Sequence, residues 1–283
     1  MVDVTRFGNE KRMTTPVTIV PVLLYHGVGE NPSEPMAFYN VQPDEFRQHL
    51  DLVVASGRRP LIASEFVHRV QAGDSVADCV LITFDDGFFD FTTHALPALV
   101  ERGLAATLYV TTGWLEDAAP TTRSRGPQDQ MLHSSDLPHI AAAGIEVGAH
   151  SHTHPKMDSL SPEAAWQEFV VPRDILSESL GKPVNAFAYP HGYNSRRLRR
   201  QAREAGYTSA VAGRESLSHS SDDVFRLARL SATAAITPRD IELWLRATGA
   251  PSASSRERVK TKAGRALRRS RGLLTRRPVS DWS

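Results

Sequence analysis

The sequence contains a single cysteine, Cys79, among 283 residues. One cysteine cannot form an intrachain disulfide or build a cysteine-based zinc site. Long apolar runs are missing as well: the most apolar early segment, 17–28, contains Pro21, Tyr25 and His26 and is shorter than the roughly 18 residues of a membrane span. No small-residue cleavage site follows it. We therefore expect a soluble protein, with a cytoplasmic location as the default.

Net charge is nearly absent, because 33 Lys and Arg balance 32 Asp and Glu to give +1. The balance combines two unlike parts: residues 256–283 hold ten basic and two acidic residues and carry +8, while the rest of the chain carries −7. Such a basic segment is typical of a solvated tail, and binding to an anionic membrane surface, at the inner face of the membrane, is the main functional alternative. No groove-reading module accompanies the charge, which argues against nucleic acid as a partner.

The chain does have a clear alternation of short apolar runs with segments of helical period. This pattern indicates βα units around a mostly parallel sheet. Strands are expected at 18–25, 80–84, 105–111, 145–149, 186–189, 208–212 and 224–230. Helices are expected at 43–57, 64–70, 92–102, 135–143, 162–180 and 195–205. About seven strands predict a distorted (β/α) barrel, with an open doubly wound sheet as the alternative, and either fold places chemistry at the carboxyl ends of the strands.

Two adjacent carboxylates, Asp85 and Asp86, follow the strand at 80–84. In a regular strand they would point to opposite faces, so both can enter one site only if the backbone leaves strand geometry, which Gly87 makes easier. Adjacent acids at a strand end also require a nearby positive charge, and a metal ion would supply it.

Three of the eleven histidines lie within 150–154, directly after the strand at 145–149. Imidazoles are ligands for zinc and similar divalent ions, and two of them with one carboxylate leave coordination positions for water and substrate. A lone histidine is more often structural, but three clustered at a strand end favour a metal site. The segment 188–192 ends another strand, and the backbone N–H of His191 or Gly192 is a candidate oxyanion donor there, although a plain βα turn is the simpler explanation.

In chain order, several motifs resemble those of the polysaccharide deacetylases of the NodB homology type, carbohydrate esterase family 4. They are P-V-L-L-Y-H-G-V at 21–28, T-F-D-D-G at 83–87, H-S-H-T-H-P at 150–155, A-Y-P-H-G at 188–192 and E-A-G-Y at 204–207. The resemblance covers most of residues 17–230. It implies a NodB-like barrel that removes N-acetyl groups from an amino-sugar-containing glycan or glycoconjugate and releases acetate. We accordingly expect a flexible N-terminus at 1–14, the deacetylase domain at 15–250 and a basic tail at 251–283, disordered or partly helical.

The resemblance also implies roles for individual residues. Asp85 matches the family's general base, and Asp86, His150 and His154 match its metal ligands. His191 stands where the family has a tyrosine whose backbone N–H donates to the oxyanion. The metal would be a divalent ion, zinc in most such enzymes, with Co²⁺, Ni²⁺, Fe²⁺ and Mn²⁺ as alternatives.

The sequence departs from the family's pattern in two places. Ala188 stands where many members have an arginine, so the arginine that steadies the catalytic base is expected to be missing from this chain. The late Leu-x-x-His motif that supplies the general acid is also absent, since only His219 follows His191. A branch resembling the biofilm exopolysaccharide deacetylases shares these losses and has a histidine in a Tyr-His pair after the first strand. His26 fits that place and is our candidate for the general acid, although a hydrogen-bonded histidine at a strand end would explain it equally well.

Trp114, Tyr193 and Phe88 lie near strand ends and are candidates for stacking on a sugar, with packing in the core as the alternative for each. Two other functions stay open: hydrolysis of a non-sugar linear or cyclic amide on the same fold, and carbohydrate binding by a catalytically silent relative. The sequence leaves the acceptor glycan, the identity of the metal and the oligomeric state undetermined.

Overall fold

The computed structural model describes residues 17–119, 123–124, 126–213 and 215–253. The N-terminal segment predicted at 1–14 lies outside the described residues, as does most of the predicted basic tail, 254–283. Residues 252 and 253 are described and pair with Leu217. Among the described helices, none has the length and apolar character needed to span a bilayer.

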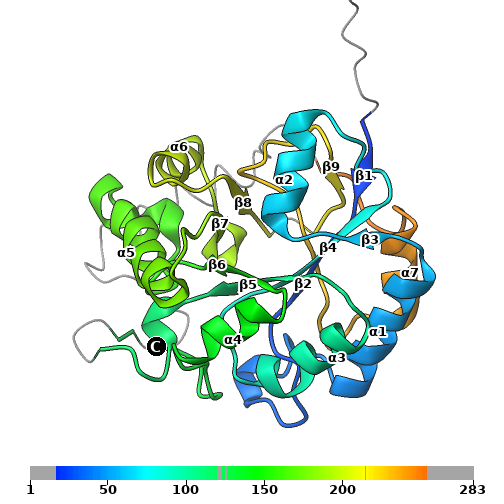
Figure 1. Cartoon of the computed structure of the whole chain (residues 1–283), viewed down its shortest axis with the longest axis horizontal. Helices are drawn as coiled ribbons and strands as arrows, with labels where there is room; N and C mark the ends of the chain where they lie inside the picture. Colours follow the sequence, from blue (N-terminus) through cyan, green and yellow to red (C-terminus); the bar gives the residue numbers. More distant parts are fainter. Residues whose placement is uncertain (1–16, 120–122, 125, 214, 254–283) are drawn as a thin grey trace, which may run out of the picture.

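Seven parallel strands form one curled sheet in the spatial order β10-β2-β4-β5-β6-β7-β8 (Figure 1). Their bounds are β2 Val22–Tyr25, β4 Cys79–Phe84, β5 Thr107–Val110, β6 Glu146–Ala149, β7 Ala186–Ala188, β8 Ser209–Val211 and β10 Leu230–Ser231. The curl brings the two edges together, since Val211 of β8 forms a bridge with Leu227 just before β10. The predicted seven-stranded barrel is confirmed, as a curled half-barrel.

Three short strands lie outside that order. β3 (Arg59–Pro60) pairs with β4, and β1 (Ile19–Val20) pairs antiparallel with β9 (Ser218–His219). The single strand predicted at 18–25 is divided into β1 and β2 at Pro21, which has no N–H to donate to a neighbouring strand.

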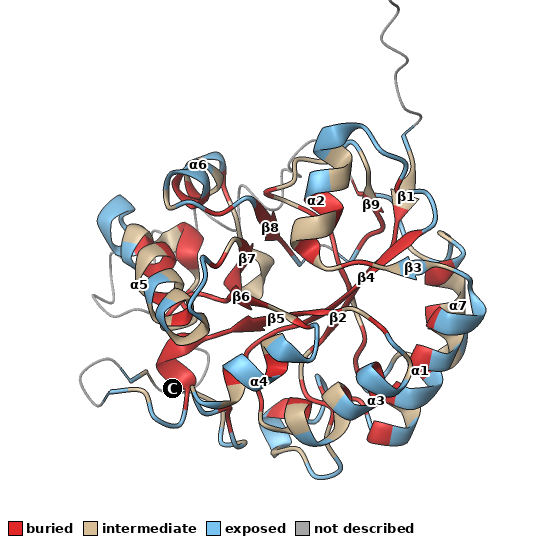
Figure 2. Ribbon diagram, viewed as in Figure 1, coloured by how far each residue is buried: buried red, intermediate tan, exposed pale blue. Residues whose placement is uncertain are grey.

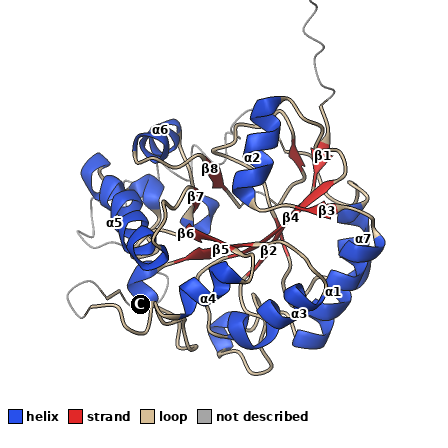
Figure 3. Ribbon diagram, viewed as in Figure 1, coloured by secondary structure: helices blue, strands red, loops and turns tan. Residues whose placement is uncertain are grey.

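The helices surround the sheet, as Figure 3 shows. They are α1 Pro43–Ala55, α2 Ala63–Ala72, α3 Leu96–Glu101, α4 Asp136–Ala142, α5 Pro162–Leu180, α6 Arg196–Glu204 and α7 Pro238–Leu245. α5 has the predicted bounds: the Ala164 N–H donates to Ser161 Oγ at its start, and Gly181 at its end has a φ of 62°. The helix predicted at 92–102 begins with a π-helical turn at Phe91–Ala95.

Alternate residues of β4 enter two different cores. Val80, Ile82 and Phe84 belong to the larger cluster, which includes apolar residues of the surrounding helices. Leu81 belongs to a smaller cluster that also holds side chains of β2, β5, β7 and β8, which places it inside the curl. Both faces of the strands are therefore buried (Figure 2), and the alternation along β4 directs Asp85 into the curl above Leu81.

Candidate metal centre and active site

The turn after β4 brings both carboxylates to the same side of the chain. Asp86 has a φ of 75° and Gly87 a φ of 95°, so the backbone leaves strand geometry at these two residues. This left-handed conformation is rare for a residue other than glycine. As a result, His150 Nε2 lies 3.6 Å from Asp85 Oδ2 and 3.5 Å from Asp86 Oδ1.

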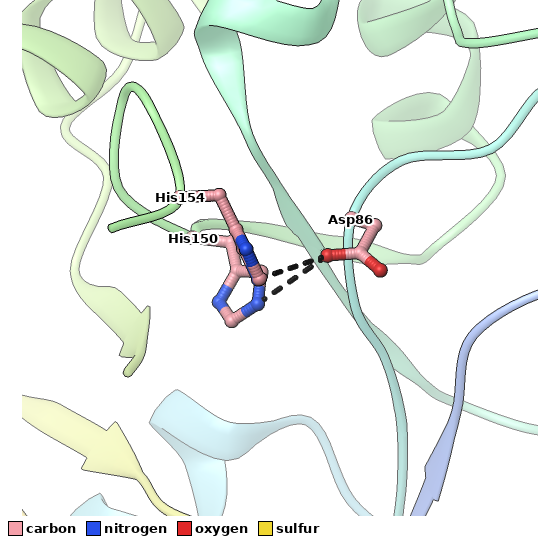
Figure 4. Close-up of side chains that lie close together, drawn as sticks. All are labelled: Asp86, His150 and His154. Carbon is pink, nitrogen blue, oxygen red and sulfur yellow. Dashed lines mark ion pairs between the residues drawn. The ribbon is translucent and has the colours of Figure 1, made fainter. Parts of the chain in front are cut away.

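Asp86, His150 and His154 form a group suited to a metal ion. One ligand atom from each lies within 4.8 Å of the other two. Figure 4 shows the two imidazoles, which come from the loop after β6, facing the Asp86 carboxylate from the loop after β4. Asp86 Oδ1 is buried and has no hydrogen-bond partner among the described residues, although both His Nε2 atoms lie 3.5 Å from it. Since an unpaired buried carboxylate oxygen is unfavourable, the donor set fits a divalent cation placed between these atoms.

The electrostatics of the group support the same conclusion. Burial, and then the charge of Asp85, raises the pKa of Asp86 well above its ordinary value. Burial lowers the pKa of His150, and burial together with the neighbouring histidines lowers the pKa of His154 well below its ordinary value. Both imidazoles are therefore neutral at pH 7, which is the form that binds metal. A bound cation would in turn favour the ionised form of Asp86.

The hydrogen bond of His150 to β7 sets its tautomer. His150 Nδ1 lies 2.9 Å from the carbonyl oxygen of Ala188. A carbonyl only accepts, so Nδ1 carries the proton. Nε2 therefore has a free lone pair on the side of Asp86, where a metal ion would bind.

Glu168 of α5 holds the loop that carries the two histidines. Its carboxylate accepts hydrogen bonds from the backbone N–H groups of His152 (2.8 Å) and Thr153 (2.9 Å) and from Thr153 Oγ1 (2.6 Å). The loop needs such support because Ser151 and His154 have φ values of 64° and 55°, which cost energy in non-glycine residues. The sequence reasoning missed Glu168, since nothing in the helical pattern of α5 connects it to the histidine motif.

Arg229 was also missed, and it contacts the candidate base directly. Its Nη1 and Nη2 each donate to one carboxylate oxygen of Asp85, both at 2.6 Å. Both side chains are almost fully buried. The prediction that this chain lacks an arginine beside the base is therefore wrong: Arg229, the residue before β10, pairs with Asp85 although Ala188 stands at the usual position. An arginine inside the apolar run 224–232 was the available signal, because a buried arginine requires a carboxylate partner.

The pairing determines the state of Asp85. Burial alone would raise the pKa of this carboxyl, but the charge of Arg229, aided by His150 and the hydrogen bonds from Arg229, outweighs burial and lowers the pKa. Asp85 is therefore ionised and fixed in orientation beside the metal group, where it can accept a proton.

His26 follows β2 and is partly buried next to the site. Burial lowers its pKa to about 4, although the charge of Asp85 acts in the opposite direction. Its Nδ1 is buried and finds no hydrogen-bond partner within the described part of the chain. The alternative, a structural histidine held by a hydrogen bond, is therefore not supported by a hydrogen bond at Nδ1. The role of His26 as general acid stays a prediction.

The other predicted site residues lie around the metal group. The His191 ring is centred 4.7 Å from that of His154, and the Tyr193 ring 5.8 Å from that of His191. His191 has a φ of 55° in the turn after β7. His152 turns its ring toward Thr112, with Nδ1 2.8 Å from Thr112 Oγ1, and does not join the metal group.

Trp114 and Phe88 are both buried, with 2% and 3% of their surface exposed. Trp114 is centred 4.7 Å from the His154 ring and also lines a pocket of about 410 Å³ with polar neighbours that include Glu116 and Arg123. Phe88 belongs to a small apolar cluster with Trp114, Met36 and Met131. Contact of either ring with a substrate stays a prediction.

Parts of the chain are similar in sequence to known proteins, and these similarities include the residues of the metal group. The family model described as polysaccharide deacetylase matches residues 72–210, which include both acids of the turn after β4 and the histidine loop. The match spans 139 of the 283 residues, and over this region the chain resembles the polysaccharide deacetylase family. Among curated proteins, it is 23% identical over 193 residues to the polysaccharide deacetylase homologue YxkH of Bacillus subtilis (strain 168). The match covers 68% of this chain and 63% of that protein, which is less than two thirds of its length.

Solved structures show the same fold. The deacetylase PplD of Streptococcus pyogenes, in complex with acetate, superposes with a TM-score of 0.70 at 23% identity, covering 80% of this chain and 97% of that one. A de-N-acetylase from Aggregatibacter actinomycetemcomitans gives 0.68 at 14% identity, covering 80% and 99%. IcaB from Ammonifex degensii gives 0.67 at 20% identity, covering 81% and 97%. The fold is therefore the NodB-type deacetylase barrel.

Proposed function

We propose that this protein is a metal-dependent N-deacetylase that hydrolyses the acetamide of an amino-sugar-containing glycan or glycoconjugate and releases acetate. The similarity of residues 72–210 to the polysaccharide deacetylase family supports a carbohydrate deacetylase. The observation that carries the proposal is the juxtaposition of an oriented, ionised carboxylate, Asp85 paired with Arg229, with the Asp86, His150 and His154 group.

Asp86, His150 and His154 would hold a divalent cation, with zinc as the ion that two imidazoles and one carboxylate suit best. When bound, such an ion polarises a carbonyl and makes a bound water more acidic. Neutral imidazoles and an ionised Asp86 are the states required of the three side chains.

The protein's own groups would then act on the acetamide and the attacking water. Asp85, held by Arg229, accepts a proton from the water as it attacks the carbonyl carbon. The backbone N–H of His191 donates to the carbonyl oxygen as negative charge develops there. His26 donates a proton to the leaving nitrogen, and because burial lowers its pKa to about 4, it has to gain that proton during the reaction cycle.

A catalytically silent relative was one alternative, and it was based on the missing arginine and the absent late histidine motif. Since Arg229 pairs with Asp85, the first of these two arguments no longer holds. Hydrolysis of a non-sugar amide remains the competing activity.

A substrate panel tests the proposal. Acetate release is measured with N-acetylglucosamine, its oligomers, acetylated sugar conjugates, and linear and cyclic amides without a sugar. We expect turnover of the acetylated amino sugars and none of the plain amides. Turnover restricted to the non-sugar amides would refute the proposed substrate class.

A further inference from the structure

Two adjacent aromatic side chains are exposed on the loop that follows β2. In the described part of the chain, the large apolar residues that are exposed are Val17, Phe38, Tyr39, Val54 and Val100. Phe38 and Tyr39 are 56% and 44% exposed, and their rings meet edge to face with centroids 5.2 Å apart. Contiguous exposed apolar surface of this kind marks binding sites more often than single exposed apolar residues do.

The pair lies next to the candidate active site. The loop begins at the carboxyl end of β2 with His26, and the Tyr39 ring is centred 5.2 Å from the ring of His26. His26 in turn interacts with the charge of Asp85. Tyr39 thus flanks the reacting groups on the β2 side, whereas Trp114 flanks them beside His154.

The loop holds both rings in a fixed position. The Asn40 side chain closes the loop with two hydrogen bonds to the backbone of Gly29, accepting from its N–H (2.9 Å) and donating to its carbonyl (2.7 Å). The carbonyl of Phe38 accepts a hydrogen bond from the N–H of Ala234, in the segment after β10 (3.0 Å). A binding surface fixed in this way loses little conformational entropy when a ligand binds.

We propose that Phe38 and Tyr39 form a platform on which a sugar ring neighbouring the deacetylated one stacks, so that the preferred substrate is an oligosaccharide or polymer. This inference rests on the proposed deacetylase function. The C–H face of a pyranose packs against an aromatic face, while its hydroxyl groups stay in water at a half-exposed site. The reacting sugar itself cannot occupy the platform, because its acetamide must reach Asp86 and His150, which are 5% and 2% exposed.

Kinetics with substrates of different length test the platform. Acetate release is compared for N-acetylglucosamine and for its oligomers of two to five sugars with wild type, Phe38→Ala, Tyr39→Ala and the double variant. We expect the KM for the oligomers to rise about tenfold in Phe38→Ala, with kcat and the monomer kcat/KM unchanged. Tyr39→Phe should behave as wild type towards the oligomers, since it keeps the ring, and Val54→Ala, which removes equally exposed apolar surface on α1, is the matched control.

Phe38→Ala is the decisive variant, because Tyr39 is the residue whose ring packs against His26, and Phe38 packs against Tyr39. Equal effects of Phe38→Ala on monomer and oligomers, or no effect at all, would overturn the inference. A wild-type dimer that Phe38→Ala converts to a monomer, seen by light scattering, would assign the pair to contact with a second copy instead. If wild type deacetylates no sugar, the proposed function fails, and calorimetric binding of chitosan oligomers to wild type and Phe38→Ala still tests the platform on its own.

Discussion

Replacing Arg229 by leucine should remove both stability and activity. The guanidinium and the Asp85 carboxylate form two hydrogen bonds of 2.6 Å, and the side chains are 1% and 3% exposed. Removing one partner of such a pair leaves an uncompensated buried charge and typically costs about 3–5 kcal/mol of the free energy of unfolding. By contrast, Arg47→Leu breaks the ion pair between Arg47 and Asp44, whose side chains are 45% and 93% exposed, and should cost at most about 1 kcal/mol.

The cost of losing Arg229 should depend on pH in a defined direction. In wild type the pKa of Asp85 is lowered, so the pair stabilises the fold above the ordinary pKa of an aspartate, and this contribution is lost as the pH falls through the lowered value. Without Arg229, burial raises the pKa of Asp85. The difference in free energy of unfolding between wild type and Arg229→Leu should therefore be small at acid pH and grow towards neutral pH.

Urea unfolding of the metal-free proteins from about pH 2 to pH 8 measures the stability, and acetate release by the metal-loaded proteins measures the activity. In the double variant Arg229→Leu/Asp85→Asn, the buried charge is gone, so part of the lost stability should return while activity stays absent. If Arg229→Leu does not fold, Arg229→Lys keeps the charge, loses the paired hydrogen bonds and should show an intermediate loss. A variant within about 1 kcal/mol of wild type at pH 7 that keeps full activity would refute the reasoning, since the assumed penalty is several times larger.

Three further predictions concern the metal group and the tail. Glu168→Gln weakens the hydrogen bonds that hold the histidine loop, so metal affinity should fall about 10- to 100-fold. Competition with a chelating dye measures the affinity. The control Glu163→Gln, at an exposed position on the same helix, should bind metal as wild type does. Because the pKa of Asp86 is raised, protons compete with the metal there; affinity should decrease as the pH is lowered, and a metal titration that stays flat from pH 8 to about pH 4 would contradict the assignment. Deletion of 256–283, which carries +8, should abolish co-sedimentation with anionic vesicles without changing turnover, and unchanged sedimentation would exclude the tail as the membrane contact.

The regular parts of the fold were predictable from local signals. α5 was predicted with its observed bounds because a serine cap and a glycine mark its two ends. Six strands of the half-barrel lie within or close to the predicted apolar runs, whereas the strand predicted at 224–230 is largely wrong, since β10 shares only Leu230 with it. β3 and β9 were missed because strands of two residues have no period to detect. α7 was missed although Thr237, Pro238 and Asp240 mark its start with a capping box.

The candidate site likewise contains residues that could be predicted from the sequence and one that could not. Asp85, Asp86, His150 and His154 were recognisable because each pair sits in a short contiguous motif at a strand end. Arg229 was not, because it is 144 residues further along the chain than Asp85, and the two meet only because β10 lies next to β2, which lies next to β4.

Acetate release from an acetylated glucosamine oligomer, measured on one preparation before metal removal, after chelation and after reloading with zinc, tests the central claim most directly. The same series with Asp86→Ala removes one ligand of the metal group. The account predicts turnover that is lost on chelation, returns with zinc and is absent in Asp86→Ala at every step. Turnover that survives both complete chelation and Asp86→Ala would contradict it.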